Sequence, residues 1–255
     1  MKSNDNIFSV FCLLMSMFFA SSKASSIPGP LKSVVATGKK GIGLAESKGY
    51  SGKQLEALQV AWYYNWGSQS KITTTVPFVP MIFSKRTVDM ALQTDIVLGF
   101  NEPDNSKQSN MSVDEALKHW PKVVAMAKRV GAPSMAGNPL FGDWLPQFMQ
   151  ANPKVDFITV HWYKGIQSKK FIKDLEAIHT SYKKPIWVTE FAPQTAGSSR
   201  NQPDKFKQQE VNTFIRETLA WMDKSPFIEI YSWHDSKLGT SALFDENGQL
   251  TETGR

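Results

Sequence analysis

The sequence predicts an α/β protein built as a single-domain (β/α)8 TIM barrel that covers residues 39–255. Eight short runs of β-branched or aromatic residues, each polar at its C-terminal end, alternate with stretches of helical pattern. The centres of these runs are apolar, which is typical of parallel strands covered by helices. The chain has 255 residues, 41% of them hydrophobic, which is enough for one substantial core.

An open, doubly wound sheet is the alternative to a barrel. Such sheets often carry a glycine-rich phosphate loop directly after the first strand. The stretch "GIGLAE" (41–46) has only the first two glycines of that fingerprint, and no P-loop lysine pattern occurs. The pattern therefore favours the barrel.

The N-terminal segment predicts a secretory signal peptide over residues 1–24. The run "IFSVFCLLMSMFFA" (7–20) is apolar, and "SKA" (22–24) offers a small-x-small cleavage site. A single membrane anchor is the alternative, but the run is short of the roughly 20 residues that a spanning helix needs. Residues 25–38, rich in Ser, Pro and Gly, are expected to form a flexible lead-in.

Cleavage of this segment would remove Cys12, the single cysteine of the chain. Disulfides, cysteine metal sites and cysteine nucleophiles are then excluded from the mature protein. The net charge of +6 would fall to +5 with the loss of Lys2, Lys23 and Asp5. Because the positive charges are spread along the chain, they indicate a solvated surface, helped by attraction to an anionic cell wall, rather than a nucleic-acid site.

The eight predicted strands follow one another along the chain with turn or helical patterns between them. In order, they are residues 41–47, 60–66, 78–84, 95–102, 133–140, 156–163, 185–192 and 228–235. Each ends in polar residues, so the carboxyl ends of the strands are where a functional site is expected.

Two predicted helices have the clearest signals. Residues 112–131 begin with Ser112 as cap and Glu115 as its reciprocal partner, and end at Gly131. Pro121 interrupts this helix and is expected to kink or split it. Residues 203–224 form the second helix, with an apolar stripe made by Phe206, Val211, Phe214, Ile215, Leu219 and Met222.

Two glutamates stand at strand ends, Glu102 after the fourth run and Glu190 in the seventh. These strands lie on opposite sides of an eight-stranded barrel, so both side chains can face one cleft across its mouth. A protonated and an ionised carboxyl arranged in this way are what glycoside hydrolysis requires. The alternatives are a surface glutamate in the turn "NEP" and a salt bridge at Glu190.

The remaining candidates are polar and aromatic residues at strand ends, which would bind the substrate. Asn101 is expected to hydrogen-bond a sugar hydroxyl next to the reacting carbon. His161 and Tyr163 are expected to share one orientation, so that either could hydrogen-bond Glu190, although a satisfied structural histidine is the alternative for His161. The other candidates are Asn65, Trp66, Asn138 and Trp233, with Trp144 a weaker one, and for each tryptophan core packing is the alternative to stacking on a sugar ring.

Other chemistries have weaker support. A metal site formed by His161, Glu190, His234 and Asp235 is conceivable, but the first run lacks the two histidines typical of barrel metallohydrolases. A serine hydrolase needs a nucleophile elbow, and the chain has no G-x-S-x-G motif. We therefore expect no cofactor.

Four motifs resemble those of the Asl1-like glycosyl hydrolase family, also called glycoside hydrolase family 128. They are "GFNEPD" (99–104), "DFITVHWY" (156–163), "WVTEFAP" (187–193) and "YSWHDS" (231–236). The resemblance, which spans about residues 40–255, implies a (β/α)8 barrel with retaining endo-β-1,3-glucanase activity. It also implies that Glu102 is the acid/base and Glu190 the nucleophile. Members of this family commonly have Trp-Phe or Tyr-Phe where this chain has Trp233 and His234.

The sequence thus predicts a secreted, monomeric, retaining hydrolase of β-1,3-glucan. The mature protein is expected to bind polysaccharide, and to bind neither nucleic acid nor, after cleavage of the signal, a membrane. Two alternatives remain open: a non-catalytic glucan-binding protein of the cell wall on the same barrel, and a retaining hydrolase of another β-linked polysaccharide such as mannan or β-1,4-glucan. The choice between endo and exo action is also open.

Overall fold

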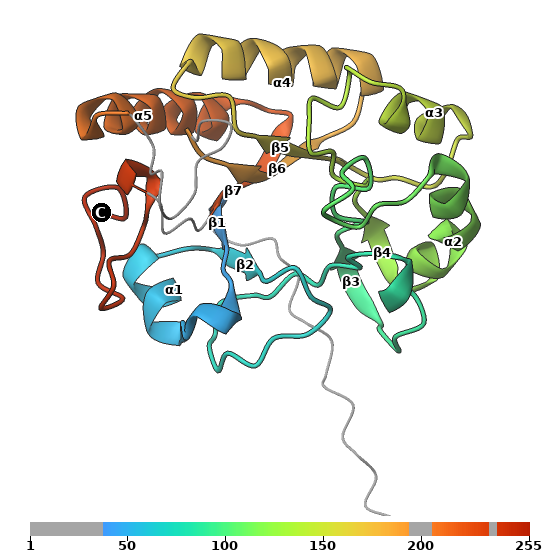
Figure 1. The fold of residues 1–255 in the computed structure, drawn as a ribbon, viewed down its shortest axis with the longest axis horizontal. Coiled ribbons are helices and arrows are strands. Elements are labelled where there is room, and N and C mark those ends of the chain that lie inside the picture. Colours follow the sequence, from blue (N-terminus) through green and yellow to red (C-terminus); the bar gives the residue numbers. More distant parts are fainter. Residues whose placement is uncertain (1–37, 194–205, 235–238) are drawn as a thin grey trace, which may run out of the picture.

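The computed structural model describes residues 38–193, 206–234 and 239–255. The predicted signal peptide and all but the last residue of the predicted lead-in lie outside these ranges. Figure 1 shows the strands at the centre of the molecule and the helices around them. Within the described ranges, no helix combines the length and the apolar composition needed to cross a membrane.

In the described ranges, seven strands form two parallel sheets. The larger sheet has the order β2-β1-β7-β6-β5 and the smaller pairs β3 with β4. The strands are β1 (Lys40–Gly43), β2 (Trp62–Tyr64), β3 (Thr94–Val97), β4 (Ala127–Val130), β5 (Ile158–Trp162), β6 (Ile186–Phe191) and β7 (Ile228–His234). All the paired strands are parallel, which confirms the predicted α/β class.

The two sheets are joined by isolated parallel bridges rather than by continuous ladders. Tyr63 bridges to Phe78 and Met81 to Leu98 on one side, while Gly131 bridges to Phe157 and Met135 to Val160 on the other. The sequence predicted one closed eight-stranded barrel, but the described residues form two sheets that no continuous ladder closes.

Two of the predicted strands need correction. Residues 78–84 contain no strand, because Pro77 and Pro80 lack the N–H groups that a ladder needs. The fifth strand lies at Ala127–Val130 instead of 133–140, where Ser134 and Met135 form single bridges. Pro133 interrupts the ladder there for the same reason.

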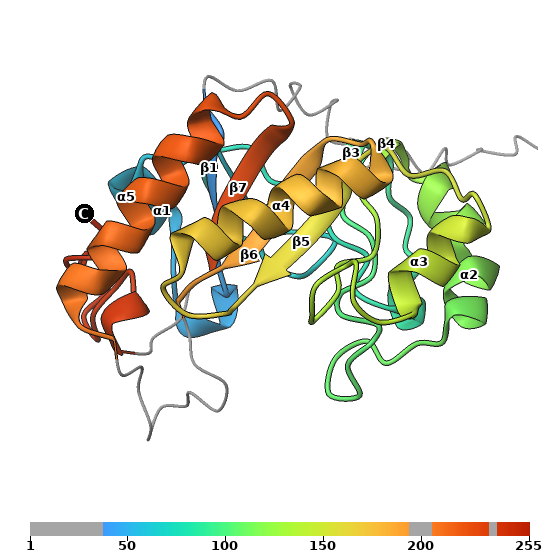
Figure 2. The same ribbon diagram turned by 90° about the horizontal axis from the view of Figure 1, so that it is seen from above.

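The helices cover the outside of the strands. They are α1 (Gly52–Leu58), α2 (Val113–Ala125), α3 (Trp144–Gln150), α4 (Ser168–Tyr182) and α5 (Gln208–Lys224), with short 3-10 turns η1 (Glu46–Lys48), η2 (Lys85–Thr87) and η3 (Gly239–Ser241). Helices α4 and α5 lie over the outer face of β5, β6 and β7 (Figure 1 and Figure 2).

Helix α2 shows where local sequence signals held and where they failed. The predicted capping box is present, since Ser112 Oγ accepts from the Glu115 N–H at 3.1 Å and Glu115 accepts from the Ser112 N–H at 3.3 Å. Pro121 does not split the helix. The helix ends at Ala125 instead of Gly131, because the next residues pair with β3 as β4.

The buried side chains form an outer and an inner cluster. The outer one lies between the strands and the helices. The inner cluster consists of Trp62, Tyr64, Val79, Met81, Leu98, Phe157, Trp187 and Ile230. Gly41 and Gly43 of β1 leave room for it, because a Cβ at Gly41 would overlap the indole of Trp62. Tyr64 stacks 6.0 Å from Trp62, and its hydroxyl reaches the groups described next.

Candidate active site

Glu102 lies in the loop that follows β3. Its backbone N–H donates to Ser134 O at 2.7 Å, and its own carbonyl accepts from the Asn105 N–H at 3.0 Å. The residue has a φ of +44°, in the left-handed region that non-glycine residues seldom adopt. This turn directs the side chain inward, and the residue is only 8% exposed. The Asn105 side-chain amide donates to Glu102 Oε2 at 3.0 Å.

Glu190 lies within β6 and is surrounded by donors. The Tyr64 hydroxyl and the Trp66 indole N–H donate to its Oε1 at 3.0 Å and 2.7 Å. The Tyr163 hydroxyl donates to its Oε2 at 2.5 Å. The side chain is 6% exposed, so these contacts replace the water that an ionised carboxylate would otherwise need.

His161 joins the two glutamates. Its Nδ1 shares a hydrogen bond of 2.9 Å with Glu102 Oε1, while its Nε2 lies 3.4 Å from Glu190 Oε1, without the alignment of a hydrogen bond. One oxygen of each glutamate lies within 4.8 Å of the other. The carboxyl groups at the ends of the predicted fourth and seventh strands therefore meet, as the sequence predicted.

The electrostatics of the cluster favour a charged Glu190. Burial alone would raise the pKa of Glu190, but His161, His234 and the donors Tyr163 and Trp66 hold it below the ordinary value. Burial would lower the pKa of His161, yet the charges of Glu190 and Glu102 raise it.

The tyrosines that surround Glu190 stay protonated. Burial, followed by the charge of Glu190, raises the pKa of Tyr64 and of Tyr163 well above the usual range. Both hydroxyl groups therefore remain donors at any physiological pH, so that the hydrogen bonds to Glu190 persist.

Four of the predicted substrate-binding residues are gathered at this cluster. His161 and Tyr163 both contact Glu190, and Trp66 does so through its indole N–H. Asn101 directly precedes Glu102 and is 3% exposed. Its amide N–H lies 3.4 Å from Gln108 Oε1, and its Oδ1 has no hydrogen-bond partner among the described residues.

Three other predicted residues are used elsewhere. The Asn65 amide bonds Glu46 and the backbone of its own loop. Asn138 Oδ1 accepts from the Leu140 N–H at 2.8 Å and so shapes the loop after β4. The Trp144 indole donates to Met111 O at 2.7 Å and stacks on Phe148.

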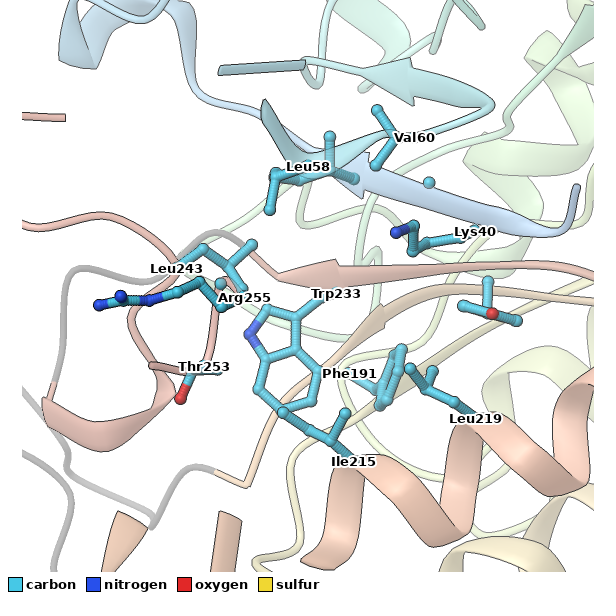
Figure 3. A pocket seen from close by; sticks show the side chains of 14 residues that line it. Lys40, Leu58, Val60, Phe191, Ile215, Leu219, Trp233, Leu243, Thr253 and Arg255 are labelled. Atoms are coloured by element: carbon cyan, nitrogen blue, oxygen red, sulfur yellow. The ribbon is translucent and has the colours of Figure 1, made fainter. Parts of the chain in front are cut away.

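Trp233 does not face the glutamates. Its indole N–H donates to Ser241 O, and its ring packs edge-on against Phe191 at 5.0 Å. Figure 3 shows Trp233 and Phe191 in a cavity of about 150 Å³ together with Ile215 of α5. This cavity lies between the strands and α5, so the expected sugar platform at Trp233 is not on the face that Glu190 uses.

Two residues that complete the site, Tyr64 and Asn105, were not among the candidates, and His234 was named above only for a metal site and beside Trp233. Tyr64 could have been found, because Trp62, Tyr64 and Trp66 alternate on one face of a strand with a period of two. His234 packs edge-on against Trp66 at 5.7 Å and Tyr163 at 5.4 Å. In the sequence, Asn105 lies in a polar turn, and nothing in its neighbours indicates a role in the site.

Glu102, His161 and Glu190 also offer one ligand atom each in the arrangement that a cation would need. The hydrogen bond between His161 and Glu102 and the three donors on Glu190 already use side-chain atoms of these residues. This geometry favours proton chemistry over metal binding. Asp235, named above for a metal site, lies outside the described residues.

Comparison with known proteins identifies the family. Residues 41–255 match the family described as Glycosyl hydrolase catalytic core. The chain is also similar to a family 128 (subgroup I) endo-β-1,3-glucanase of Amycolatopsis mediterranei, solved with laminaritriose, with 31% identity and a TM-score of 0.75 over 85% of this chain and 96% of that one. The chain is an Asl1-like member of glycoside hydrolase family 128.

Other relatives of this family 128 member differ in activity and in length. A subgroup V exo-β-1,3-glucanase of Cryptococcus neoformans is 25% identical, with a TM-score of 0.73 over 85% of this chain and 96% of that one. Alkali-sensitive linkage protein 1 of Schizosaccharomyces pombe is 31% identical over 214 residues, which are 76% of this chain and 39% of that protein. The family 128 chain thus spans about two fifths of the length of that relative.

Proposed function

We propose that the chain is a retaining endo-β-1,3-glucanase in which Glu102 and Glu190 perform a double displacement. One observation carries the proposal: an oxygen of Glu102 lies within 4.8 Å of an oxygen of Glu190. Retaining enzymes keep their carboxyl groups about 5–5.5 Å apart, whereas inverting enzymes separate them by roughly 6.5–9.5 Å to admit a water. The separation here supports the retaining class.

Glu190 is the nucleophile in this proposal. It is ionised because three neutral donors and the charge of His161 stabilise its negative form. A carboxylate held in this way attacks the anomeric carbon and forms a glycosyl-enzyme ester. Since the donors are already in place, no reorganisation is needed when the reaction begins.

Glu102 is the acid/base. It donates a proton to the glycosidic oxygen as that bond breaks, and then takes a proton from the water that hydrolyses the ester. His161 lies between the two carboxyls and holds the side chain of Glu102 through the hydrogen bond of 2.9 Å. Asn101 and the aromatic rings of Trp66 and Tyr163 would bind the sugar.

The substrate class comes from the relatives. The subgroup I enzymes of Amycolatopsis mediterranei are endo-β-1,3-glucanases solved with laminarin oligosaccharides, and they are more similar in sequence than the exo enzyme of Cryptococcus neoformans. Endo action on β-1,3-glucan is therefore the proposal.

The finer points of fold and location belong to the same proposal. The four bridges between the two sheets support a (β/α)8 barrel of eight parallel segments, with 78–81 as the third. The apolar run at residues 7–20 supports secretion, and the positive net charge supports retention at an anionic cell wall. We also propose that the protein is a monomer that binds polysaccharide and does not bind nucleic acid or a membrane.

The test is product analysis on laminarin, curdlan, mannan and cellulose, with the anomeric form of the first product followed by NMR. We expect β-1,3-linked oligosaccharides whose new reducing ends have the β configuration. An α-configured first product would contradict retention. Tight binding of laminarin oligosaccharides without cleavage would instead favour the glucan-binding alternative, and cleavage of mannan or cellulose alone would replace the substrate.

A further inference from the structure

The loop that follows β2 carries a chain of contacts that ends on Glu190. We propose that Glu46 and Asn65 are positioning residues, which act through Trp66 to hold the indole N–H on Glu190. The inference rests on the function proposed above, because it assigns a role in setting the nucleophile. It replaces the expected role of Asn65 as a ligand for sugar hydroxyls.

Trp66 is the last link of this chain. Its indole N–H lies 2.7 Å from Glu190 Oε1, shorter than the 3.0 Å from the Tyr64 hydroxyl to the same oxygen. Its ring packs against Tyr64 at 5.0 Å and edge-on against His234 at 5.7 Å. The hydrogen bond to Glu190 and the packing against Tyr64 and His234 together fix the orientation of the indole.

The backbone of Trp66 is in an unfavourable conformation. Its φ is +63°, in the left-handed region that a residue with a bulky side chain avoids. Such a conformation persists only when neighbouring contacts hold it. The indole therefore reaches Glu190 only if the surrounding loop is held closed.

Asn65 closes the loop around Trp66. Its Oδ1 accepts from the Gly67 N–H at 2.9 Å, on the far side of Trp66. Its Nδ2 donates to Gln69 O at 2.8 Å and to Glu46 Oε1 at 2.6 Å. Both hydrogens of the amide nitrogen are thus used inside the protein, which leaves none for a sugar hydroxyl.

Glu46 anchors the same loop to the end of β1. Besides Asn65, it accepts from the Ser70 hydroxyl at 2.5 Å and from the Lys71 N–H at 3.0 Å. All of these partners donate, which favours the ionised carboxylate. Burial would raise the pKa of Glu46, but these hydrogen bonds keep it below the ordinary value.

The test begins with Trp66→Phe, which keeps an aromatic face and removes the N–H. A lost hydrogen bond to a charged group predicts a fall in kcat of roughly ten- to a hundredfold. The acid limb of kcat/KM should move to higher pH, because Glu190 loses a donor that favours its ionised form. A stacking platform alone would instead raise KM and leave the pH profile in place.

Asn65→Ala and Glu46→Gln should reproduce this effect in weaker form. In the Trp66→Phe background, they should add little, because the contact through which they act is already gone. Glu56→Gln, an exposed glutamate of α1, is the matched control and should leave kinetics unchanged. If Asn65→Ala unfolds, the double variant Asn65→Asp/Glu46→Gln replaces it. In this variant the amide at position 46 can donate to the carboxylate at position 65, which reverses the direction of the wild-type hydrogen bond. Its activity should be higher than that of Asn65→Asp alone.

The outcomes separate this inference from the proposed function. Wild-type kcat and pH profile in folded Asn65→Ala and Glu46→Gln would overturn the inference, as would effects that add fully to those of Trp66→Phe. Activity retained in Glu190→Gln would instead overturn the role of the nucleophile itself. NMR titration of 13C-labelled glutamate carboxyls reads the pKa of Glu190 without turnover, and an unchanged pKa in Trp66→Phe would also contradict the inference.

Discussion

The two glutamates of the site are the same residue type in two different settings. Glu190 sits inside a strand and receives three neutral donors from Tyr64, Trp66 and Tyr163. Glu102 sits in a loop, on a left-handed backbone, with Asn105 and His161 as its partners. Both are almost fully buried, so burial does not distinguish them.

The difference lies in the donors. Glu190 accepts hydrogen bonds from three neutral donors, which stabilise its charged form, whereas Glu102 accepts from Asn105 and shares one hydrogen bond with His161. The surroundings thus divide the work between the two residues. The following predictions test that division, beginning with the largest effect.

Removal of either carboxylate should have the largest effect and should also show which residue does what. Glu190→Ala should abolish turnover on laminarin, and added azide should yield an α-glycosyl azide, because azide then attacks from the side of the missing nucleophile. Glu102→Ala should lose between about 10²- and 10⁴-fold in kcat, and azide should yield a β-glycosyl azide from the intermediate. Product NMR distinguishes the two anomers.

Formation of the same glycosyl azide anomer by both variants would contradict the assignment of different roles to Glu102 and Glu190. Glu102→Gln and Glu190→Gln serve as the near-isosteric partners, and their circular dichroism should match that of the wild type. Large losses of rate in these folded variants would show that the carboxyl chemistry, rather than the shape of the side chain, is required.

His161→Gln should have the next largest effect, since His161 touches both carboxylates. Without its charge, Glu190 is less stabilised as the ionised form, so its pKa rises and the acid limb of activity moves to higher pH. The free energy of unfolding should fall as well. Because the pKa of Glu190 is lower in the folded protein than in the unfolded chain, its ionisation stabilises the fold at pH values above the unfolded-state pKa. This contribution is lost as the pH falls through the folded-state pKa, and His161→Gln should reduce it. Urea unfolding of both proteins at acidic and neutral pH measures this.

The tyrosines should rank according to which oxygen they bind. Tyr163 is the hydroxyl donor on Glu190 Oε2, at 2.5 Å, whereas Tyr64 shares Oε1 with Trp66. Tyr163→Phe should therefore lose roughly ten- to a hundredfold in kcat, and Tyr64→Phe less than that. Both should move the acid limb upward. A larger loss for Tyr64→Phe would show that Oε1 is the more important oxygen, and equal losses would contradict the predicted ranking.

The sequence predicted the meeting of Glu102 and Glu190 because it depends only on strand order and on the side where strands end. It did not predict that 127–130 would be a strand, because "AKRV" continues a helical pattern and only its pairing with β3 decides the matter. Local signals such as the Ser112 cap were read correctly, since neighbouring residues determine them.

The direction of single side chains was harder to predict. Asn65 and Trp66 are adjacent at a strand end, yet one braces the loop and the other contacts Glu190. Alternation along residues 62–66 places these two side chains on opposite sides, but nothing in the residue types shows that Asn65 bonds its own loop rather than a sugar. The pairing of β6 with β7 is irregular between Val188 and Phe191, so counting by twos does not reliably orient residues near Glu190.

The smallest effect on activity should come from Trp233, which contrasts with Trp66 at the other side of the sheet. Trp233→Phe removes the hydrogen bond to Ser241 O and enlarges the cavity of about 150 Å³. We expect a loss of about 1–2 kcal/mol in the free energy of unfolding, with kcat and KM on laminarin within about twofold of the wild type. A large rise in KM with unchanged stability would mean that Trp233 faces the sugar after all. That result would require β7 to turn its outer face toward Glu102 and Glu190, and it would contradict the assignment of the glutamates to the opposite face.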